Sequence, residues 1–375
     1  MHDRRQFIRT CLLGAGGCML GLGRSSARAL WLGNGEGPGR WSKEAMFYGK
    51  SADGIECHQC PNGCVLGVGE TGRCRNRMEH EGKLYSLAYG NPCAVHIDPI
   101  EKKPFFHFLP ATRAYSIAAA GCNFACLNCQ NWQISQVGPG ETDNYDLMPA
   151  DVVEQCARNK CESIAYTYAE PTTFYEYAFD TAMRARSAKI RNVWKSNGYI
   201  REEPLRRLCP YLDAANIDLK GYDDDVYLRL NGGRLEPVLA TLRTLKKENV
   251  WLEITNLVIP GWTDDTDKIK KMCAWLVENG LRDTPVHFSR FVPLYKLAHL
   301  PSTPLDRLEE ARSIALGAGL RYVYIGNVPG HEGENTTCHH CKRLIIGRKG
   351  FAIVEKHMRE GRCAYCGTLI PGVWT

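Results

Sequence analysis

The chain has 375 residues, of which 44% are hydrophobic and 23% charged, the composition of an ordinary folded protein. Its net charge is +6, but the first 29 residues contain five Arg and one Asp, so the rest carries only about +2. No block of like charge stands out, which leaves nucleic-acid binding without an electrostatic basis. The 18 cysteines are unusual; they fall into spaced groups, which favours metal sites over a disulfide framework.

The first 29 residues are expected to be a twin-arginine signal peptide. The pair Arg4-Arg5 precedes the apolar Phe7, a short apolar run follows, and Ala27-Arg28-Ala29 resembles a cleavage site. The run is too short and too rich in Gly to span a bilayer, so we expect no membrane span in the mature chain. Twin-arginine export carries folded proteins, and a periplasmic location is expected, with a cytoplasmic one as the alternative.

Four parts follow the signal peptide. Residues 30–56 are rich in Gly and are expected to form a linker or a loosely ordered arm. Residues 57–112 contain a compact cysteine group. Residues 113–330 alternate between strand and helix patterns, and residues 331–375 contain a last cysteine group and little else.

The alternating part predicts a parallel sheet wrapped by helices, as a full or partial barrel or a doubly wound sheet. Strands are predicted at 115–119, 164–168, 190–195, 215–219, 250–258, 286–288 and 322–325. Helices are predicted between them at 149–160, 172–189, 235–249 and 266–279.

Polar residues gather where the predicted strands end, which in a barrel is the face that carries the active site. For any one of them, a local hydrogen bond in a loop is an alternative explanation, but that is not expected of the whole set. They are Glu170, Ser196, Asn197, Asp218, Lys220, Glu253, Asn256, His287, Arg290 and Asn327.

Three cysteines after the first predicted strand have the spacing C-x3-C-x2-C: Cys122, Cys126 and Cys129. A structural zinc site needs four ligands. A [4Fe–4S] cluster held by only three thiolates leaves one iron open for a reactant. A structural metal with a remote fourth ligand, or free buried thiols, are the alternatives.

This motif resembles the signature of radical S-adenosylmethionine (SAM) enzymes. The resemblance implies a partial (β/α)6-type TIM barrel, in which the open iron binds SAM and one electron from the cluster cleaves it to a 5′-deoxyadenosyl radical. Phe124, between the first two cysteines, also fits the family pattern.

The chain is most similar to the subgroup named AmmeMemoRadiSam, which looks like the pyruvate formate-lyase activating enzymes. The matching stretches include GCNFACLNCQNWQISQ, YTYAEPTTFYEY, NIDLKGY and YVYIGNVPGHEGENT, and together they span residues 83 to about 337. The chain departs from the pattern at Cys93 and in its lengthened N-terminus.

Individual roles follow from the resemblance. Cys122, Cys126 and Cys129 are expected to hold the [4Fe–4S] cluster. Glu170 stands where the family binds the amino group of SAM, and Ser196 and Asn197 where it contacts the ribose. Further expected contacts are Asp218 and Lys220, the latter with the SAM carboxylate, and His287 and Arg290, which with Lys220 are the candidate catalytic residues.

The first four-cysteine group is Cys57, Cys60, Cys64 and Cys74, four thiolates within 18 residues. Gly and Pro turns between them would let the segment wrap one metal ion or cluster. Zinc and a second iron–sulfur cluster are equally compatible with this spacing.

The last group consists of two C-x2-C hairpins, Cys338 with Cys341 and Cys363 with Cys366, separated by 21 residues. This spacing predicts a zinc ribbon-like module. So small a segment lacks the core to fold alone, so the metal would supply its stability.

The sequence thus favours a radical SAM oxidoreductase that abstracts a hydrogen atom from an unidentified substrate. The resemblance allows either a protein glycyl site or a small molecule as substrate, with flavodoxin or ferredoxin as electron donor. It also implies Memo-like and AMMECR-type proteins as candidate partners. The alternative is an exported multi-cluster electron-transfer or metal-binding protein without radical chemistry. Export favours this alternative, because SAM is a cytosolic metabolite and an exported site that it cannot reach would be idle.

Overall fold

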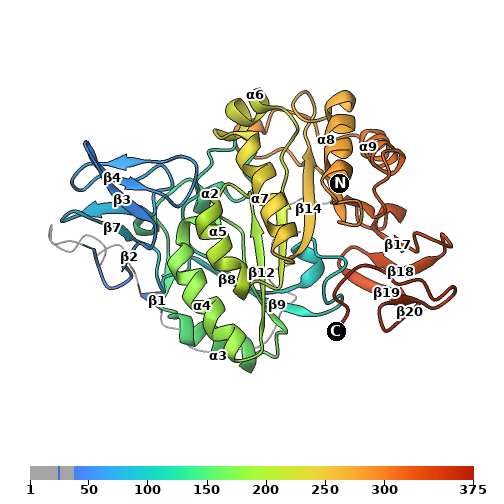
Figure 1. Cartoon of the computed structure of the whole chain (residues 1–375), viewed down its shortest axis with the longest axis horizontal. Coiled ribbons are helices and arrows are strands. Elements are labelled where there is room, and N and C mark those ends of the chain that lie inside the picture. Colours follow the sequence, from blue (N-terminus) through green and yellow to red (C-terminus); the bar gives the residue numbers. More distant parts are fainter. Residues whose placement is uncertain (1–23, 26–37) are drawn as a thin grey trace.

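The computed structural model describes residues 24–25 and 38–375 (Figure 1). Within the predicted signal peptide, only β1 (Arg24–Ser25) belongs to this part, and it pairs with β10 (Asn144–Tyr145). The twin-arginine pair and the cleavage pattern lie outside the described residues. In the described part, no helix has the length and apolar character needed to cross a membrane.

The centre of the fold is an eight-stranded sheet in which seven strands run parallel. Each parallel strand overlaps one of the seven predicted runs, which confirms the predicted partial α/β barrel. The eighth strand, β8 (Ala94–Pro99), pairs antiparallel with β9 and was not predicted. The parallel strands are β9 (Arg113–Ala118), β11 (Ser163–Tyr166), β12 (Arg191–Ser196), β13 (Ala214–Asp218), β14 (Trp251–Val258), β15 (Val286–Arg290) and β16 (Val323–Gly326).

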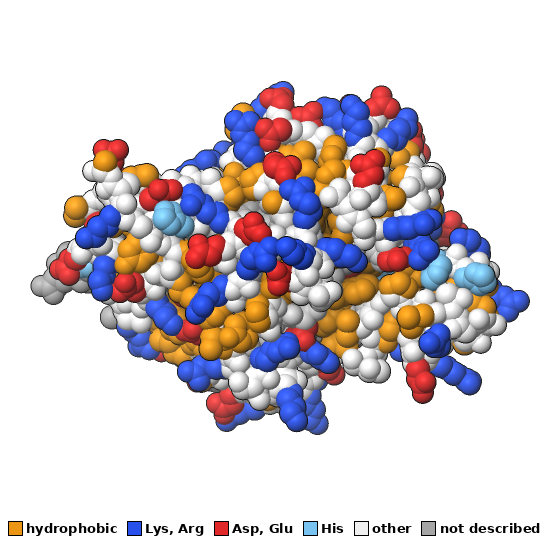
Figure 2. Space-filling view, viewed as in Figure 1, with side chains coloured by type: hydrophobic (Ala, Val, Ile, Leu, Met, Phe, Trp, Pro, Cys, Tyr) orange, Lys and Arg blue, Asp and Glu red, His pale blue; other side chains and the backbone are white. Residues whose placement is uncertain are grey.

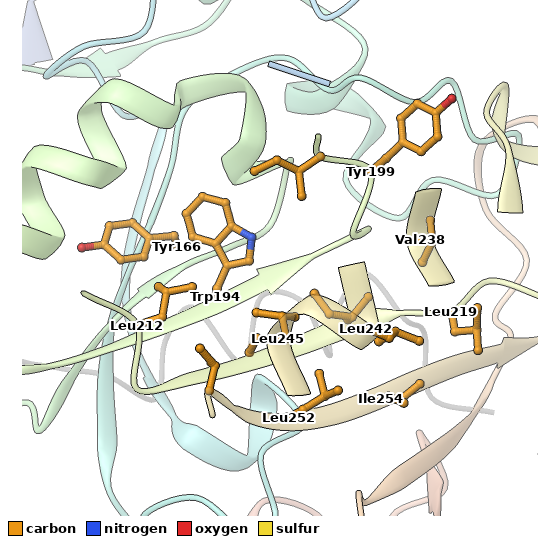
Figure 3. Packing of buried hydrophobic residues seen from close by; sticks show 14 of the residues in the cluster. Tyr166, Trp194, Tyr199, Leu212, Leu219, Val238, Leu242, Leu245, Leu252 and Ile254 are labelled. Atoms are coloured by element: carbon orange, nitrogen blue, oxygen red, sulfur yellow. The ribbon is translucent and has the colours of Figure 1, made fainter. Parts of the chain in front are cut away.

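Helices connect these strands and pack on one face of the curved sheet (Figure 1). Figure 3 shows how α7 does so: Val238, Leu242 and Leu245 lie three and four residues apart and pack over Leu252 and Ile254 of β14. The helices are α2 (Trp132–Ser135), α3 (Pro149–Arg158), α4 (Tyr175–Ser187), α5 (Glu202–Leu208), α6 (Asp224–Val226), α7 (Leu235–Lys247), α8 (Thr266–Glu278) and α9 (Leu305–Gly317).

The other face of the sheet lines a polar barrel interior. Successive side chains of a strand point to opposite faces. Because Trp194 belongs to the cluster packed under the helices, its neighbour Lys195 points into the barrel. There its ammonium group donates to Asn216 Oδ1 (2.7 Å), which also accepts from the Thr255 hydroxyl (2.8 Å).

Residues 100–112 close the bottom of the barrel, where Phe105 and Phe108 pack with small residues at the strand starts. The C-terminal module docks here, since the Arg348 guanidinium donates to the carbonyl of Phe106 (2.9 Å). Its strands are β17 (Thr336–Thr337), β18 (Leu344–Lys349), β19 (Ala352–Lys356), β20 (Met358–Arg359) and β21 (Arg362–Cys363).

The N-terminal module begins earlier than the sequence predicted. Within the predicted linker, residues 43–56 contain strands that pair with one another and with β7, so the described part from residue 38 differs from a loose arm. The reason is that Trp41, Phe47 and Ile55 are buried, whereas the Gly-rich composition ends near Gly39. The strands are β2 (Lys43–Glu44), β3 (Tyr48–Ser51), β4 (Gly54–Cys57), β5 (Val65–Leu66), β6 (Arg77–His80) and β7 (Lys83–Ser86).

Candidate active site

The loop after β9 carries Cys122, Cys126 and Cys129 at the carboxyl end of the sheet, as expected. In the described part of the chain, these three sulfurs do not all lie within 4.8 Å of one another. A [4Fe–4S] cluster, the group that the C-x3-C-x2-C spacing predicts, binds each thiolate to a different iron and does not require the sulfurs to converge on one point.

Each of the three sulfurs has a hydrogen-bond partner from the protein. Such contacts lower the negative charge on a cluster's ligands and tune its potential. The partners are the Phe124 backbone N–H for Cys122 (3.4 Å), the Asn231 side-chain amide for Cys126 (3.2 Å) and the Ser135 hydroxyl for Cys129 (3.0 Å).

Glu170 joins the ends of β11 and β12 to the cysteine loop. Its carboxylate is 1% exposed and accepts from the Ser196 hydroxyl (2.8 Å) and from the Asn197 backbone N–H (2.8 Å). Asn197 in turn donates from its side chain to Asn123 Oδ1 (2.8 Å), beside Cys122. Burial raises the pKa of Glu170 above its usual value. The structure thus brings three predicted residues together as one support for the loop.

Asp218 and Lys220 form a second group near the loop, with Lys195 as a third member. Asp218 is in ion-pair contact with Lys195, and the Lys220 ammonium lies 3.0 Å from its other oxygen. Burial raises the pKa of Asp218, but the two cations outweigh it and bring it to about 2. Burial likewise lowers the pKa of Lys220, yet Asp218 and Cys126 raise it above its usual value. Burial lowers the pKa of Lys195, although Asp218 opposes that shift. With both lysines protonated, the group carries a net positive charge beside Cys126.

Neither His287 nor Arg290 hydrogen-bonds to the cysteine loop in the described structure. The buried His287 ring bonds to Glu253 (2.7 Å) and stacks on Tyr324. It therefore belongs to the network at the barrel floor. Arg290 Nε donates to the carbonyl of Thr303 (2.9 Å) at the end of β15.

Sequence reasoning missed four residues that contact the site: Lys195, Asn123, Asn231 and Ser135. Only Lys195 carried a signal, because a lysine inside a strand of a parallel sheet is unusual unless it is paired. The partner of Asn231, Cys126, is 105 residues away, and no local pattern indicates such a contact.

The four sulfurs of the C-terminal cysteine group lie close enough together to bind a single metal ion. Among the described residues, Cys338, Cys341, Cys363 and Cys366 have sulfurs that all lie within 4.8 Å of one another, and two pairs are 3.7 Å apart. A tetrahedral zinc ion with bonds of about 2.3 Å requires about 3.8 Å. Hydrogen bonds from Thr368 lower the pKa of Cys366 to about 6, which favours the thiolate.

Comparison with known proteins identifies the family of the chain. The model of the Radical SAM superfamily matches residues 116–273. Uncharacterized protein MJ0808 of Methanocaldococcus jannaschii is 47% identical over 331 residues, which cover 88% of this chain and 98% of that protein. The chain belongs to the same family as this relative and to the radical SAM superfamily, so it is an enzyme of radical chemistry whose family uses a [4Fe–4S] cluster and SAM.

Two activating enzymes are also similar to the chain. The pyruvate formate-lyase 1-activating enzyme of Escherichia coli is 26% identical over 158 residues, 40% of this chain and 63% of that enzyme. The 4-hydroxyphenylacetate decarboxylase activating enzyme of Clostridium scatologenes is 23% identical over 121 residues, 32% of this chain and 38% of that enzyme. These alignments confirm the predicted similarity to activating enzymes.

Proposed function

We propose that the protein is a radical SAM oxidoreductase that cleaves SAM reductively and abstracts a hydrogen atom from a substrate. The observation that carries this proposal is the net positive group of Lys195, Asp218 and Lys220 next to Cys126. An electron carrier needs no cation beside its cluster, whereas a site for the SAM carboxylate does.

Different residues of the chain are proposed to bind the cluster and to bind SAM. Cys122, Cys126 and Cys129 hold the cluster, which when bound supplies the electron that cleaves SAM to the 5′-deoxyadenosyl radical. Lys220, whose side chain is 19% exposed, binds the carboxylate of SAM, and Asp218 keeps it charged and oriented. Glu170 is the proposed partner of the amino group, and it fixes the backbone of Asn197.

The similarity to two activating enzymes supports a protein glycyl site as substrate. A small molecule is the other class, and it would suit a shared pathway with the Memo-like and AMMECR-type proteins. Flavodoxin or ferredoxin is the proposed electron donor, and zinc the ion of the C-terminal module. The twin-arginine pattern supports export to the periplasm, although SAM would then have to be bound before export. On the face shown in Figure 2, Lys and Arg are interspersed with Asp and Glu, which offers no uniform surface for nucleic acid.

The test is SAM cleavage by the full chain. The protein is purified anaerobically, reconstituted with iron and sulfide and reduced with dithionite, and 5′-deoxyadenosine is quantified. We expect Cys126→Ala to abolish the product. Lys220→Met should raise the KM for SAM tenfold or more, because a hydrogen bond to a charged group contributes about 1.5–3 kcal/mol.

Lys270→Met is the matched control, since Lys270 is 60% exposed on α8, and its KM should equal that of the wild type. If the wild type forms no 5′-deoxyadenosine with a fully loaded cluster, the proposal is wrong, and the electron-transfer alternative takes its place.

A further inference from the structure

Cys57, Cys60, Cys64 and Cys74 surround a cavity that is open on one side. The volume of this cavity is about 20 Å³, and all four cysteines line it. In the part of the chain that is described, no three of these sulfurs lie within 4.8 Å of one another. In the C-terminal group, by contrast, two pairs of sulfurs lie 3.7 Å apart. The sulfurs of the first group therefore line the cavity without converging on one point.

The wall of this cavity contains buried polar groups without partners. Arg77 is 2% exposed, and its Nε and Nη2 atoms donate to no acceptor, while Nη1 donates to Glu176 (2.9 Å). Gln59, 3% exposed, has no partner for either side-chain polar atom. A buried polar group without a partner destabilises the fold, because its lost hydration is not replaced. Donors that line a ring of thiolates indicate an anionic occupant with acceptor atoms of its own.

The cavity also borders the active-site loop. A methyl group added to Gly121 would come within 2.4 Å of the Cys74 carbonyl oxygen, so the two backbones are in direct contact one residue before Cys122. Asn62 donates to the carbonyl of Asn123 (2.8 Å). Asn123 and Thr172 line the cavity, and Thr172 donates its backbone N–H to Glu170.

We propose that Cys57, Cys60, Cys64 and Cys74 hold a second, polynuclear iron–sulfur cluster, and that it relays electrons to the cluster at Cys122, Cys126 and Cys129. Its bridging sulfides accept the free N–H groups of Arg77 and Gln59. A single zinc ion needs its sulfurs about 3.8 Å apart, whereas no three of these sulfurs lie within 4.8 Å of one another among the described residues.

The relay moves one electron at a time. A reduced one-electron carrier protein gives one electron to the N-terminal cluster and is itself oxidised; this cluster then returns to its oxidised state by reducing the active-site cluster. No bond is made or broken in either transfer. This role rests on the proposed function, whereas the presence of the second cluster does not.

The first experiment removes the active-site cluster and asks what remains. The full-length Cys122/Cys126/Cys129→Ala variant is reconstituted with iron and sulfide, and its iron, acid-labile sulfide and zinc are measured. We expect iron and sulfide to remain, together with an electron paramagnetic resonance signal after reduction. Adding Cys60→Ala and Cys64→Ala should remove both. About one zinc per chain from the C-terminal module serves as the standard for a folded protein.

Two zinc ions per chain with no sulfide in the triple variant would overturn the proposal. Because this measurement does not use SAM, it stands even if the protein forms no 5′-deoxyadenosine. The relay is tested by the Cys60/Cys64→Ala variant of the otherwise wild-type chain. Its 5′-deoxyadenosine formation driven by reduced flavodoxin should fall at least tenfold more than that driven by dithionite. An equal loss with both reductants would refute the relay.

Discussion

The two four-cysteine groups have the same ligands but different surroundings. The N-terminal group belongs to the module of β3, β4 and β7 (blue in Figure 1), while the C-terminal group belongs to the module of β17–β20 on the opposite side of the barrel (red). The first borders the active-site loop through Gly121. The second docks at the barrel floor through Arg348. Cysteine count alone therefore says little about role: convergence of the sulfurs and distance from the reactive loop distinguish a structural site from a redox site.

The largest expected effect is the loss of the C-terminal metal. Cys363→Ser should reduce bound zinc from about one per chain to near zero and unfold residues 331–375, because zinc contributes on the order of 10 kcal/mol to such small modules. Limited proteolysis and zinc analysis measure both effects. Iron bound at the N-terminal group should be unchanged; a parallel loss of that iron would mean that the two groups are not independent.

A smaller effect is expected where the N-terminal module meets the loop. Gly121 has a φ of +97°, and an added methyl group would meet the Cys74 carbonyl oxygen at 2.4 Å. Gly121→Ala should lower the free energy of unfolding by about 3 kcal/mol. Gly261→Ala is the control: its φ is +74° but its site is open, so only backbone strain of about 1 kcal/mol is expected.

Urea unfolding followed by circular dichroism measures the difference between the two alanine variants. Equal destabilisation would show that the contact between Cys74 and Gly121 contributes nothing beyond strain, and the near module would then be no more tightly coupled to the loop than the far one.

The smallest effect concerns the floor beneath the C-terminal module. His107 is buried there and bonds to the carbonyl of Pro371 (2.7 Å) and the Tyr324 hydroxyl (2.6 Å). Burial lowers its pKa to about 4, although Glu253 opposes the shift. Between pH 6.5 and 4 the unfolded chain therefore binds more protons than the folded one, so stability falls as the pH falls.

Between pH 6.5 and 5, His107 should account for about 2 kcal/mol of lost stability. The measurement is urea unfolding of the wild type and His107→Gln across this range. The variant should have a correspondingly shallower pH dependence, and identical slopes would show that His107 takes up its proton in the folded state.

Much of the fold could be predicted because strands and helices leave local periodic signals. All seven parallel strands were found in this way, and so was the position of the cysteine loop at the carboxyl end of β9. The antiparallel β8 was missed, because its sequence, AVHIDP, alternates weakly and contains charged and polar residues. The strands at 43–56 were missed because the Gly-rich stretch before them led to the prediction of a linker over the whole of residues 30–56.

The site was harder to predict than the fold, because its contacts depend on register between strands. Lys195 lies opposite Asn216 in the pairing of β12 with β13, and that alignment brings it to Asp218. His287 was expected to be a catalytic residue from its place at the end of a strand, and no local pattern indicated its bond to Glu253 on the neighbouring strand. The position of a residue at the end of a strand predicts which face of the sheet its side chain can reach, but not which residue it hydrogen-bonds to.

The barrel floor has a consequence for how the chain is made. His107 and Pro371 are separated by 264 positions, and Val373 donates to the carbonyl of His107 (2.8 Å) while its own carbonyl accepts from Leu109 (2.7 Å). During synthesis, His107 and Leu109 therefore lack these partners until Pro371 and Val373 have been made. Until they leave the ribosome, the hydrogen bonds of His107 and Leu109 to Pro371 and Val373 cannot form, and closing so long a loop makes these contacts a late step in folding.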